Sequence, residues 1–144
     1  MKEIRVGIIE DSASCMKNNK DLLLQLNNEL EKKGFKFIYE AYTNPVDYKI
    51  RNKEFDIVII DYHFSSYTYG ANGFYMAKYT KEKYPKCLTI INSSYSPFEI
   101  GHLLDEFKIY VDEYAHKKET KMSAEHSLKS TVLRCVRKLV DIPL

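Results

Sequence analysis

The sequence predicts an α/β fold, a doubly wound five-stranded parallel sheet in the order 2-1-3-4-5 with helices on both faces. Short apolar runs such as 57–60 lack polar alternation, which is typical of strands buried on both faces. These runs alternate with segments of helical periodicity, and that alternation favours right-handed crossovers between parallel strands. A length of 144 residues suits one domain with a buried core, so we expect a single domain over residues 1–144.

Apolar patterning places the strands, and polar residues follow several of them. The first apolar run ends at Glu10-Asp11, the third at Asp61, and the fourth at Asn92-Ser93-Ser94. The second run alternates apolar and polar residues, and the fifth begins at Ile109. The expected strands are therefore residues 4–9, 35–41, 57–60, 88–91, and 109 to about 116.

Helical spacing and capping signals predict five helices. Ser12 or Ser14 caps the first, Leu22 and Leu24 widen its apolar stripe, and Gly34 supplies its stop signal. A proline suits the first turn of a helix, where its missing N–H costs nothing. The other helices are expected from Asn44-Pro45 to about 51, from about 73 to 84, from Pro97 through Phe107, and from a cap at Ser123 to about 139.

The predicted topology brings several polar side chains to one edge of the sheet. Strands one, three and four are neighbours, so Glu10, Asp11, Asp61 and Ser93 should converge at their carboxyl ends. Lys117 follows the fifth strand and can reach the same place. Three close carboxylates repel one another, and a divalent cation relieves that repulsion. An oxygen-rich site of this kind suits Mg²⁺.

The same groups suit phosphoryl transfer, which needs mainly positioning and neutralisation of charge. Lys117 and Ser93 supply a cation and a hydroxyl, which are groups that hold a phosphoryl oxygen. A carboxylate can act as a nucleophile and form an aspartyl phosphate. Asp61 is the best candidate because it stands alone at the end of the central strand.

At these residues the chain resembles the receiver domain of two-component response regulators, and the resemblance covers nearly the whole sequence. A switch aromatic stands three residues before the lysine in that family. The matching residues are Glu10-Asp11 in VGIIEDS, the phosphorylated aspartate Asp61 in FDIVIIDY, Ser93 in TIINSSY, Lys117 in DEYAHKK, and the switch aromatic Tyr114.

The resemblance implies how such a switch works. Mg²⁺ would be bound by Glu10, Asp11, Asp61 and the backbone carbonyl of His63. A histidine kinase or phosphotransfer protein would donate the phosphoryl group to Asp61, and the chain would catalyse only its own phosphorylation and dephosphorylation. Ser93 and Lys117 would then move toward the phosphoryl oxygens, and Tyr114 would turn inward. A downstream protein or a second copy would bind the surface formed by the fourth helix, fifth strand and fifth helix.

Two features depart from the family pattern. Gly73 lies twelve residues after Asp61, about four more than usual, and the intervening loop lacks the usual proline. The tyrosines of this loop and Phe64 would shield the site, alter phosphate lifetime or contact a partner; the tyrosines are Tyr62, Tyr67 and Tyr69. Lys118 replaces a proline that commonly follows the lysine, so we expect a trans peptide there.

Composition excludes several other classes of protein. The 22 basic and 20 acidic residues leave a net charge of +2, too small a field to indicate direct binding to nucleic acid or to a membrane. The three cysteines lack metal-ligand or paired spacing, which favours reduced thiols and a cytoplasmic location. No apolar run reaches the length of a membrane span. No output domain follows the last helix, so the chain is a stand-alone receiver or part of a longer protein.

Some alternatives stay open at this point. Ser94 lies beside Ser93, and Lys118 beside Lys117, so either neighbour could take the assigned role. The chain could also be a receiver-like interaction scaffold that works without phosphorylation. A phosphatase of the haloacid-dehalogenase type also forms an aspartyl phosphate, but that family has a second aspartate where this chain has His63.

Overall fold

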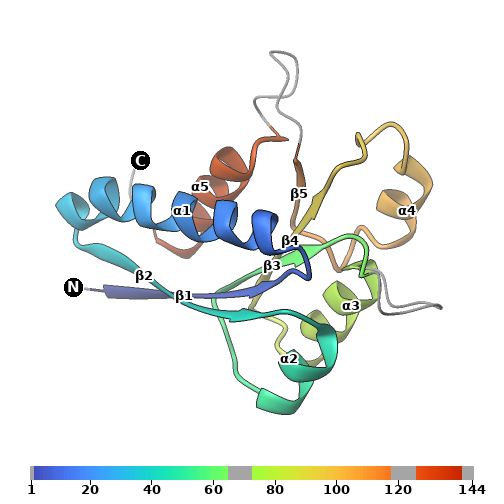
Figure 1. The fold of residues 1–144 in the computed structure, drawn as a ribbon, viewed down its shortest axis with the longest axis horizontal. Coiled ribbons are helices and arrows are strands. Elements are labelled where there is room, and N and C mark those ends of the chain that lie inside the picture. The colour runs from blue at the N-terminus through green and yellow to red at the C-terminus, as the bar shows by residue number, and fades with distance from the viewer. Residues whose placement is uncertain (1, 65–72, 118–125, 141–144) are drawn as a thin grey trace.

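A computed structural model of the chain describes residues 2–64, 73–117 and 126–140 (Figure 1). Its single five-stranded sheet has the order β2-β1-β3-β4-β5, and all four neighbouring pairs are parallel. This confirms the predicted topology. The strands are β1 Lys2–Ile9, β2 Phe35–Tyr42, β3 Ile57–Asp61, β4 Leu88–Ser93 and β5 Glu113–His116.

Helices cover both faces of the sheet (Figure 1). Those in the described ranges are α1 Ala13–Leu30, the 3-10 helix η1 Glu31–Lys33, α2 Pro45–Arg51, α3 Gly73–Lys83, α4 Gly101–Glu106 and α5 Leu128–Leu139. Helices α1 and α5 lie on one face, and α2 and α3 lie on the other. Among the described residues, no helix combines the length and the apolar character that crossing a membrane requires.

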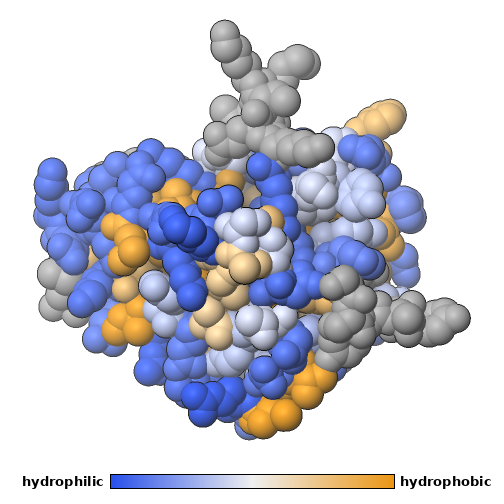
Figure 2. Space-filling view, viewed as in Figure 1, coloured by the Kyte–Doolittle hydropathy of each residue, from blue (hydrophilic) through white to orange (hydrophobic). Residues whose placement is uncertain are grey.

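Each face of the sheet has its own apolar core because the side chains of a strand alternate between faces. On the α1 and α5 side, Ile8 and Ile59 pack with Leu23 and Val132. On the other side, Ile60 and other strand residues pack with aromatic side chains that include Tyr48, Phe74 and Phe107. Figure 2 shows one face of the molecule, where hydrophilic side chains dominate and apolar ones are scattered.

Local signals explain the beginnings and ends of the N-terminal helices. The Ser12 hydroxyl, the first of the two predicted caps, accepts a hydrogen bond from the Cys15 amide at 3.4 Å. Asn44 caps α2 by accepting from the Asp47 amide at 2.9 Å. Gly34 has a φ of +86° after η1, a conformation that glycine adopts without strain. The prediction for Leu24 was wrong, because its side chain is 54% exposed on the solvent side of α1.

The segment before β5 differs from the prediction. Strand β5 begins at Glu113, and the apolar run from Ile109 forms a turn that leads to it. The Thr89 hydroxyl donates to the Tyr110 carbonyl at 2.5 Å, and the Asp112 carboxylate accepts from the Thr89 amide at 2.8 Å. These bonds hold the run against the start of β4, and they leave Ile109 72% exposed.

Two helix starts also differ from the prediction. Helix α4 begins at Gly101, so Pro97 lies in a turn that precedes the helix. Helix α5 is capped by Ser127, whose hydroxyl accepts from the Ser130 amide at 3.1 Å. Ser123, the predicted cap, lies outside the described residues. The nearest serine before the apolar stripe therefore takes the capping role.

Candidate functional site

The sheet register brings the predicted residues to one edge. Asp61 is the last residue of β3 and lies opposite Asn92 on β4. Ser93 is the next residue of β4 and lies opposite His116 on β5. Lys117 follows directly, and its amide donates to the Ser93 carbonyl at 2.7 Å. Parallel pairing thus places three strand ends, with their polar residues, side by side.

Lys117 joins two of the carboxylates. Its Nζ atom lies 3.0 Å from Glu10 Oε1 and 2.8 Å from Asp61 Oδ1. Glu10 is 1% exposed and Asp61 is 7% exposed, whereas the Lys117 side chain keeps 20% of its surface. A buried carboxylate is costly unless it is paired, so the ammonium group compensates both of them.

The three carboxylates form a cluster that fits a divalent cation. Glu10, Asp11 and Asp61 each offer an oxygen, and these oxygens lie within 4.8 Å of one another. Glu10 Oε2 is buried and has no hydrogen-bond partner among the described residues. Hard cations prefer such oxygen ligands, and one would satisfy the orphaned atom. The residues present therefore fit Mg²⁺.

The pKa shifts of the clustered side chains show the charge repulsion that a bound cation would relieve. Burial and the neighbouring Asp61 carboxylate raise the pKa of Glu10 to about 7. Burial also raises the pKa of Asp61, although hydrogen bonds from Lys117 and Glu10 oppose the shift. The paired carboxylates raise the pKa of Lys117 despite its burial, so the lysine stays charged. Where the carboxylate pair retains a proton, we assign it to Glu10, so Asp61 is the ionised partner of the pair.

Burial distinguishes the two neighbouring serines. Ser93 is 1% exposed, and its hydroxyl accepts from the Tyr95 amide at 3.0 Å. Ser94 is exposed, and its carbonyl lies 3.1 Å from His116 Nε2. The buried hydroxyl at the strand end is therefore that of Ser93.

Tyr114 points into the protein. It is 7% exposed, and its hydroxyl donates to the backbone carbonyl of Tyr95. Burial raises the pKa of Tyr114 to about 12, so the hydroxyl keeps its proton near neutral pH. Tyr114 is therefore inward in this structure, and its inward turn on phosphorylation stays a prediction.

Gly73 fixes how closely α3 approaches the end of β3. Its amide donates to the Tyr62 carbonyl at 2.7 Å. A Cβ atom on this residue would lie 2.3 Å from the Asp61 carbonyl oxygen, closer than any side chain can come. Glycine is thus required here by space. The sequence signal was a glycine at the start of a predicted helix, but it did not reveal this contact.

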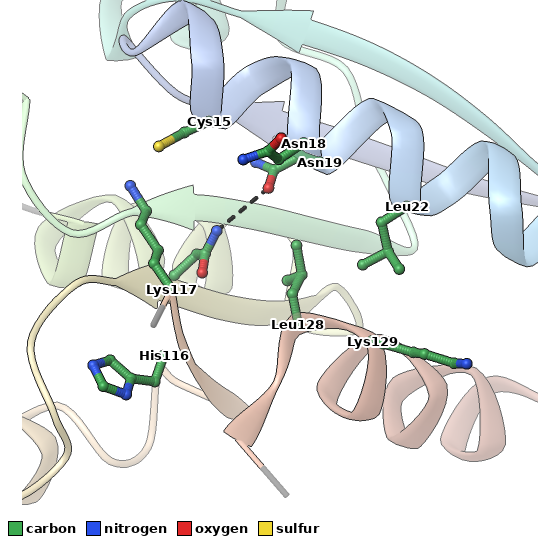
Figure 3. A pocket seen from close by; sticks show the side chains of 9 residues that line it. Cys15, Asn18, Asn19, Leu22, His116, Lys117, Leu128 and Lys129 are labelled. Carbon is green, nitrogen blue, oxygen red and sulfur yellow. Dashed lines mark hydrogen bonds between the residues drawn. The ribbon is translucent and has the colours of Figure 1, made fainter. Parts of the chain in front are cut away.

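A cavity of about 460 Å³ is lined by side chains of α1 and α5 and by residues at the ends of β4 and β5 (Figure 3). Cys15, Asn19 and Leu22 reach it from α1, and Leu128 reaches it from α5. Lys117 lines both the cavity and the cluster. Asn92 Nδ2 donates to Asn19 Oδ1 at 3.4 Å across its inner wall, between two residues that were not predicted site residues.

Other predicted residues take different positions. His63 is exposed two residues after Asp61, and its carbonyl remains a predicted metal ligand. Phe64 is 1% exposed and packs in the core cluster that includes Phe74 of α3, and its effect on the site stays a prediction. Tyr67, Tyr69 and Lys118 lie outside the described residues.

The sequence matches no protein-family model and no curated protein sequence. Solved structures do match. The receiver domain of DrrB, a Thermotoga maritima protein, in its BeF3-activated form is 18% identical, with 95% of this chain and 99% of that chain covered and a TM-score of 0.70. TrrA from Thermotoga maritima, in complex with Mg²⁺-BeF, is 21% identical, with 94% and 99% covered and a TM-score of 0.55.

A third similar structure is a response regulator protein from Burkholderia pseudomallei that has a phosphorylated aspartic acid, a calcium ion and citrate. It is 15% identical, with 98% of this chain and 76% of that chain covered and a TM-score of 0.56. Together with the strand order, these matches confirm the predicted architecture. The chain has the fold of response regulator receiver domains.

Proposed function

We propose that residues 1–144 act as one receiver domain, a phosphorylation-dependent signalling switch that accepts a phosphoryl group on Asp61. The observation that carries this proposal is the contact of the Lys117 ammonium group with both Glu10 and Asp61 at the strand ends. A buried aspartate with a cation on one oxygen is oriented as a nucleophile. The same cation can neutralise charge on an incoming phosphoryl group.

The reaction follows from these positions. An Asp61 carboxylate oxygen attacks the phosphorus of a phosphohistidine on a kinase or phosphotransfer protein. The new O–P bond forms while the P–N bond breaks, and the electron pair of that bond returns to the imidazole nitrogen. Lys117 is 2.8 Å from Asp61 Oδ1 before transfer, so it can follow the charge onto the phosphoryl oxygens. The chain itself turns over no other substrate.

Glu10, Asp11 and Asp61 would hold Mg²⁺, with the His63 carbonyl as a further ligand. The fit of the carboxylate cluster supports this assignment, as does the Mg²⁺-BeF complex of the similar TrrA structure. When bound, the ion offsets negative charge on the carboxylates and on the transferred phosphoryl group. Glu10 releases its proton when it binds the ion, because a ligand carboxylate must be ionised.

The signal then leaves the site through Ser93 and Tyr114. The buried Ser93 hydroxyl can donate to a phosphoryl oxygen while it accepts from the Tyr95 amide. Tyr114 reports this change through its bond to the Tyr95 carbonyl. A downstream protein, or a second copy of the chain, would bind the surface of α4, β5 and α5. The three free cysteines support a cytoplasmic location.

Phosphorylation can be tested with acetyl phosphate as a small donor. Incubation with Mg²⁺ and acetyl phosphate, followed by intact-mass measurement, should show one phosphoryl adduct that is lost on mild base treatment. Asp61→Asn should abolish the adduct. Asp105→Asn changes an exposed aspartate of α4 in the same way and should leave it intact. No adduct on the unsubstituted chain would overturn the proposal.

A further inference from the structure

Tyr62 directly follows Asp61, and its ring contacts the rings of two other elements. It meets Phe74 of α3 edge-to-face, with centroids 5.7 Å apart. It also meets Tyr95, beyond the end of β4, with centroids 5.5 Å apart and an interplanar angle of 76°. Phe74 continues to Phe107 at the end of α4, 5.5 Å away. The Tyr62 ring therefore contacts the segment that leads into α4 directly and reaches Phe107, at the end of α4, through Phe74.

Tyr95 is held in three ways, and each leads to a residue of the proposed switch. Its amide donates to the Ser93 hydroxyl at 3.0 Å, and its carbonyl accepts from the Tyr114 hydroxyl. Its ring packs against that of Tyr62, the neighbour of Asp61. The two backbone bonds connect Tyr95 to β4 and β5. The ring contact connects it to Tyr62, the residue directly after β3.

The turn at residues 96–99, which follows Tyr95, carries an exposed side chain that can report the position of the turn. Phe98 lies three residues further along the chain and is 95% exposed. The Ser96 amide donates to the Glu99 carboxylate at 2.9 Å, and the Glu99 amide donates to the Ser96 carbonyl at 3.1 Å. Residues 96–99 therefore form one compact turn that directly follows Tyr95.

We propose that the Tyr62–Tyr95 contact, here called the aromatic bridge, couples the state of Asp61 to the position of the exposed turn at 96–99. Tyr62 and Tyr95 are positioning residues. The bridge favours the arrangement in which Tyr114 is inward and its hydroxyl is bonded to Tyr95. The inference rests on the proposed function, because a phosphoryl group on Asp61 is the ligand that selects the same arrangement.

Coupling of this kind is reciprocal. If the bridge and a phosphoryl group favour one arrangement, then removal of the bridge must weaken the binding of a phosphoryl analogue. An edge-to-face pair contributes enough to change such an affinity by about 3- to 10-fold. Affinity for Mg²⁺ alone should not change, because Glu10, Asp11 and Asp61 are untouched.

The experiment uses the full chain with Phe98→Trp, which introduces a single tryptophan into a sequence that has none. The 95% exposure of Phe98 means that the larger ring displaces nothing. Beryllofluoride is titrated at saturating Mg²⁺, and tryptophan emission is followed. The midpoint gives the affinity for the analogue, and the amplitude gives the response of the turn. Fluorine NMR on the same samples detects binding independently of emission.

Tyr62→Leu and Tyr95→Leu should each weaken beryllofluoride binding by about 3- to 10-fold and reduce the emission change. The double variant should resemble the weaker single variant, because both substitutions remove one shared contact. Tyr62→Phe keeps the ring and should restore the response. Tyr79→Leu is the matched control, since Tyr79 is a half-buried tyrosine of α3 whose ring meets Tyr48, 6.4 Å away.

A Tyr62→Leu variant with an unchanged midpoint and amplitude would overturn the inference, and so would strictly additive effects of the two substitutions. If Tyr62→Leu does not fold, Tyr95→Leu decides alone, because Tyr95 is 46% exposed. Beryllofluoride binding that is insensitive to both rings contradicts the bridge and leaves the proposed function standing. Fluorine NMR that shows no binding to the chain with both rings intact overturns the proposed function, and the bridge with it.

Discussion

The edge of the sheet that carries Asp61 and the neighbouring α4 region are built in opposite ways. At the edge, Glu10, Asp61 and Ser93 are buried, and they are held by bonds to Lys117 and Tyr95. Helix α4 has six residues, of which none is buried. Segments with few buried apolar contacts open and shift at low cost. The proposed phosphorylation site thus lies on a buried frame of strand ends, whereas α4, part of the proposed output surface, has few buried contacts to hold it in place.

Substitution of glycine by alanine should separate the two regions most strongly. Gly73→Ala puts a methyl group 2.3 Å from the Asp61 carbonyl, and backbone must move to make room. We expect a loss of about 3 kcal/mol in the free energy of unfolding, measured by urea denaturation. Gly101→Ala is the control in α4, where nothing lies within 4 Å of the new methyl group, and it should change stability little. Equal effects at both sites would contradict the comparison.

Removal of a lysine ammonium group should have the next largest effect on stability. Lys117→Met leaves Glu10 and Asp61 buried without their shared partner, so we expect a loss of about 2 kcal/mol near pH 8 without Mg²⁺. The pair of Lys17 with Asp21 on α1 is exposed, and Lys17→Met should change stability by less than about 0.5 kcal/mol. Urea denaturation of both variants checks this, and a small effect at Lys117 would mean that the buried pair is not maintained.

The raised pKa of Glu10 predicts how stability depends on pH. Its pKa rises from 4.5 to about 7 on folding, so the folded chain holds the proton more tightly. The resulting stabilisation is complete below pH 4.5 and is lost as the pH rises through 7. Without metal, Glu10→Gln should remove this decline, which thermal unfolding at a series of pH values would show. If the stability of the variant still declines with rising pH, another titrating group causes the decline.

Mg²⁺ binding should show the opposite trend with pH. Binding displaces the Glu10 proton, so affinity should increase with pH, at up to about tenfold per unit below pH 7, and level off above it. Calorimetric titration with Mg²⁺ in buffers of different ionisation enthalpy counts the released protons. An interaction scaffold with a collapsed site would show no Mg²⁺ binding at any pH.

The smallest effects are expected on the exposed apolar side chains near α4. Phe98→Ser and Ile109→Ser change residues that are 95% and 72% exposed, so each should alter the free energy of unfolding by less than about 0.5 kcal/mol. Urea denaturation again provides the measurement. A loss near 2 kcal/mol would mean that these side chains are buried in solution, for instance between two copies of the chain.

Patterns local in the chain predicted the fold well. The run 57–60 indicated a buried strand, and Ser12 and Asn44 indicated helix starts, because strands and caps depend on nearby residues. The run from Ile109 was misread because its place depends on bonds to Thr89, twenty residues away. An apolar run alone does not distinguish a strand from a turn that packs on the core.

The residues that meet at the strand ends could likewise be predicted, since parallel topology alone brings Asp61 and Lys117 together. The ion pair between these two side chains could not be predicted, because it depends on side-chain orientation. The close approach of Gly73 and the ring contact of Tyr62 with Tyr95 were also beyond the sequence pattern. Both depend on how α3 and the segment after β4 pack in three dimensions, which no spacing along the chain specifies.

The central claim, that Asp61 accepts the phosphoryl group, is tested most directly by chemical mapping. Borohydride reduces an aspartyl phosphate to homoserine, which peptide sequencing by mass spectrometry locates. After treatment with acetyl phosphate and Mg²⁺, we expect homoserine at position 61 and at no other aspartate. Homoserine at Asp11 or Asp56 in its place, or no homoserine in a chain that binds Mg²⁺, would contradict the claim.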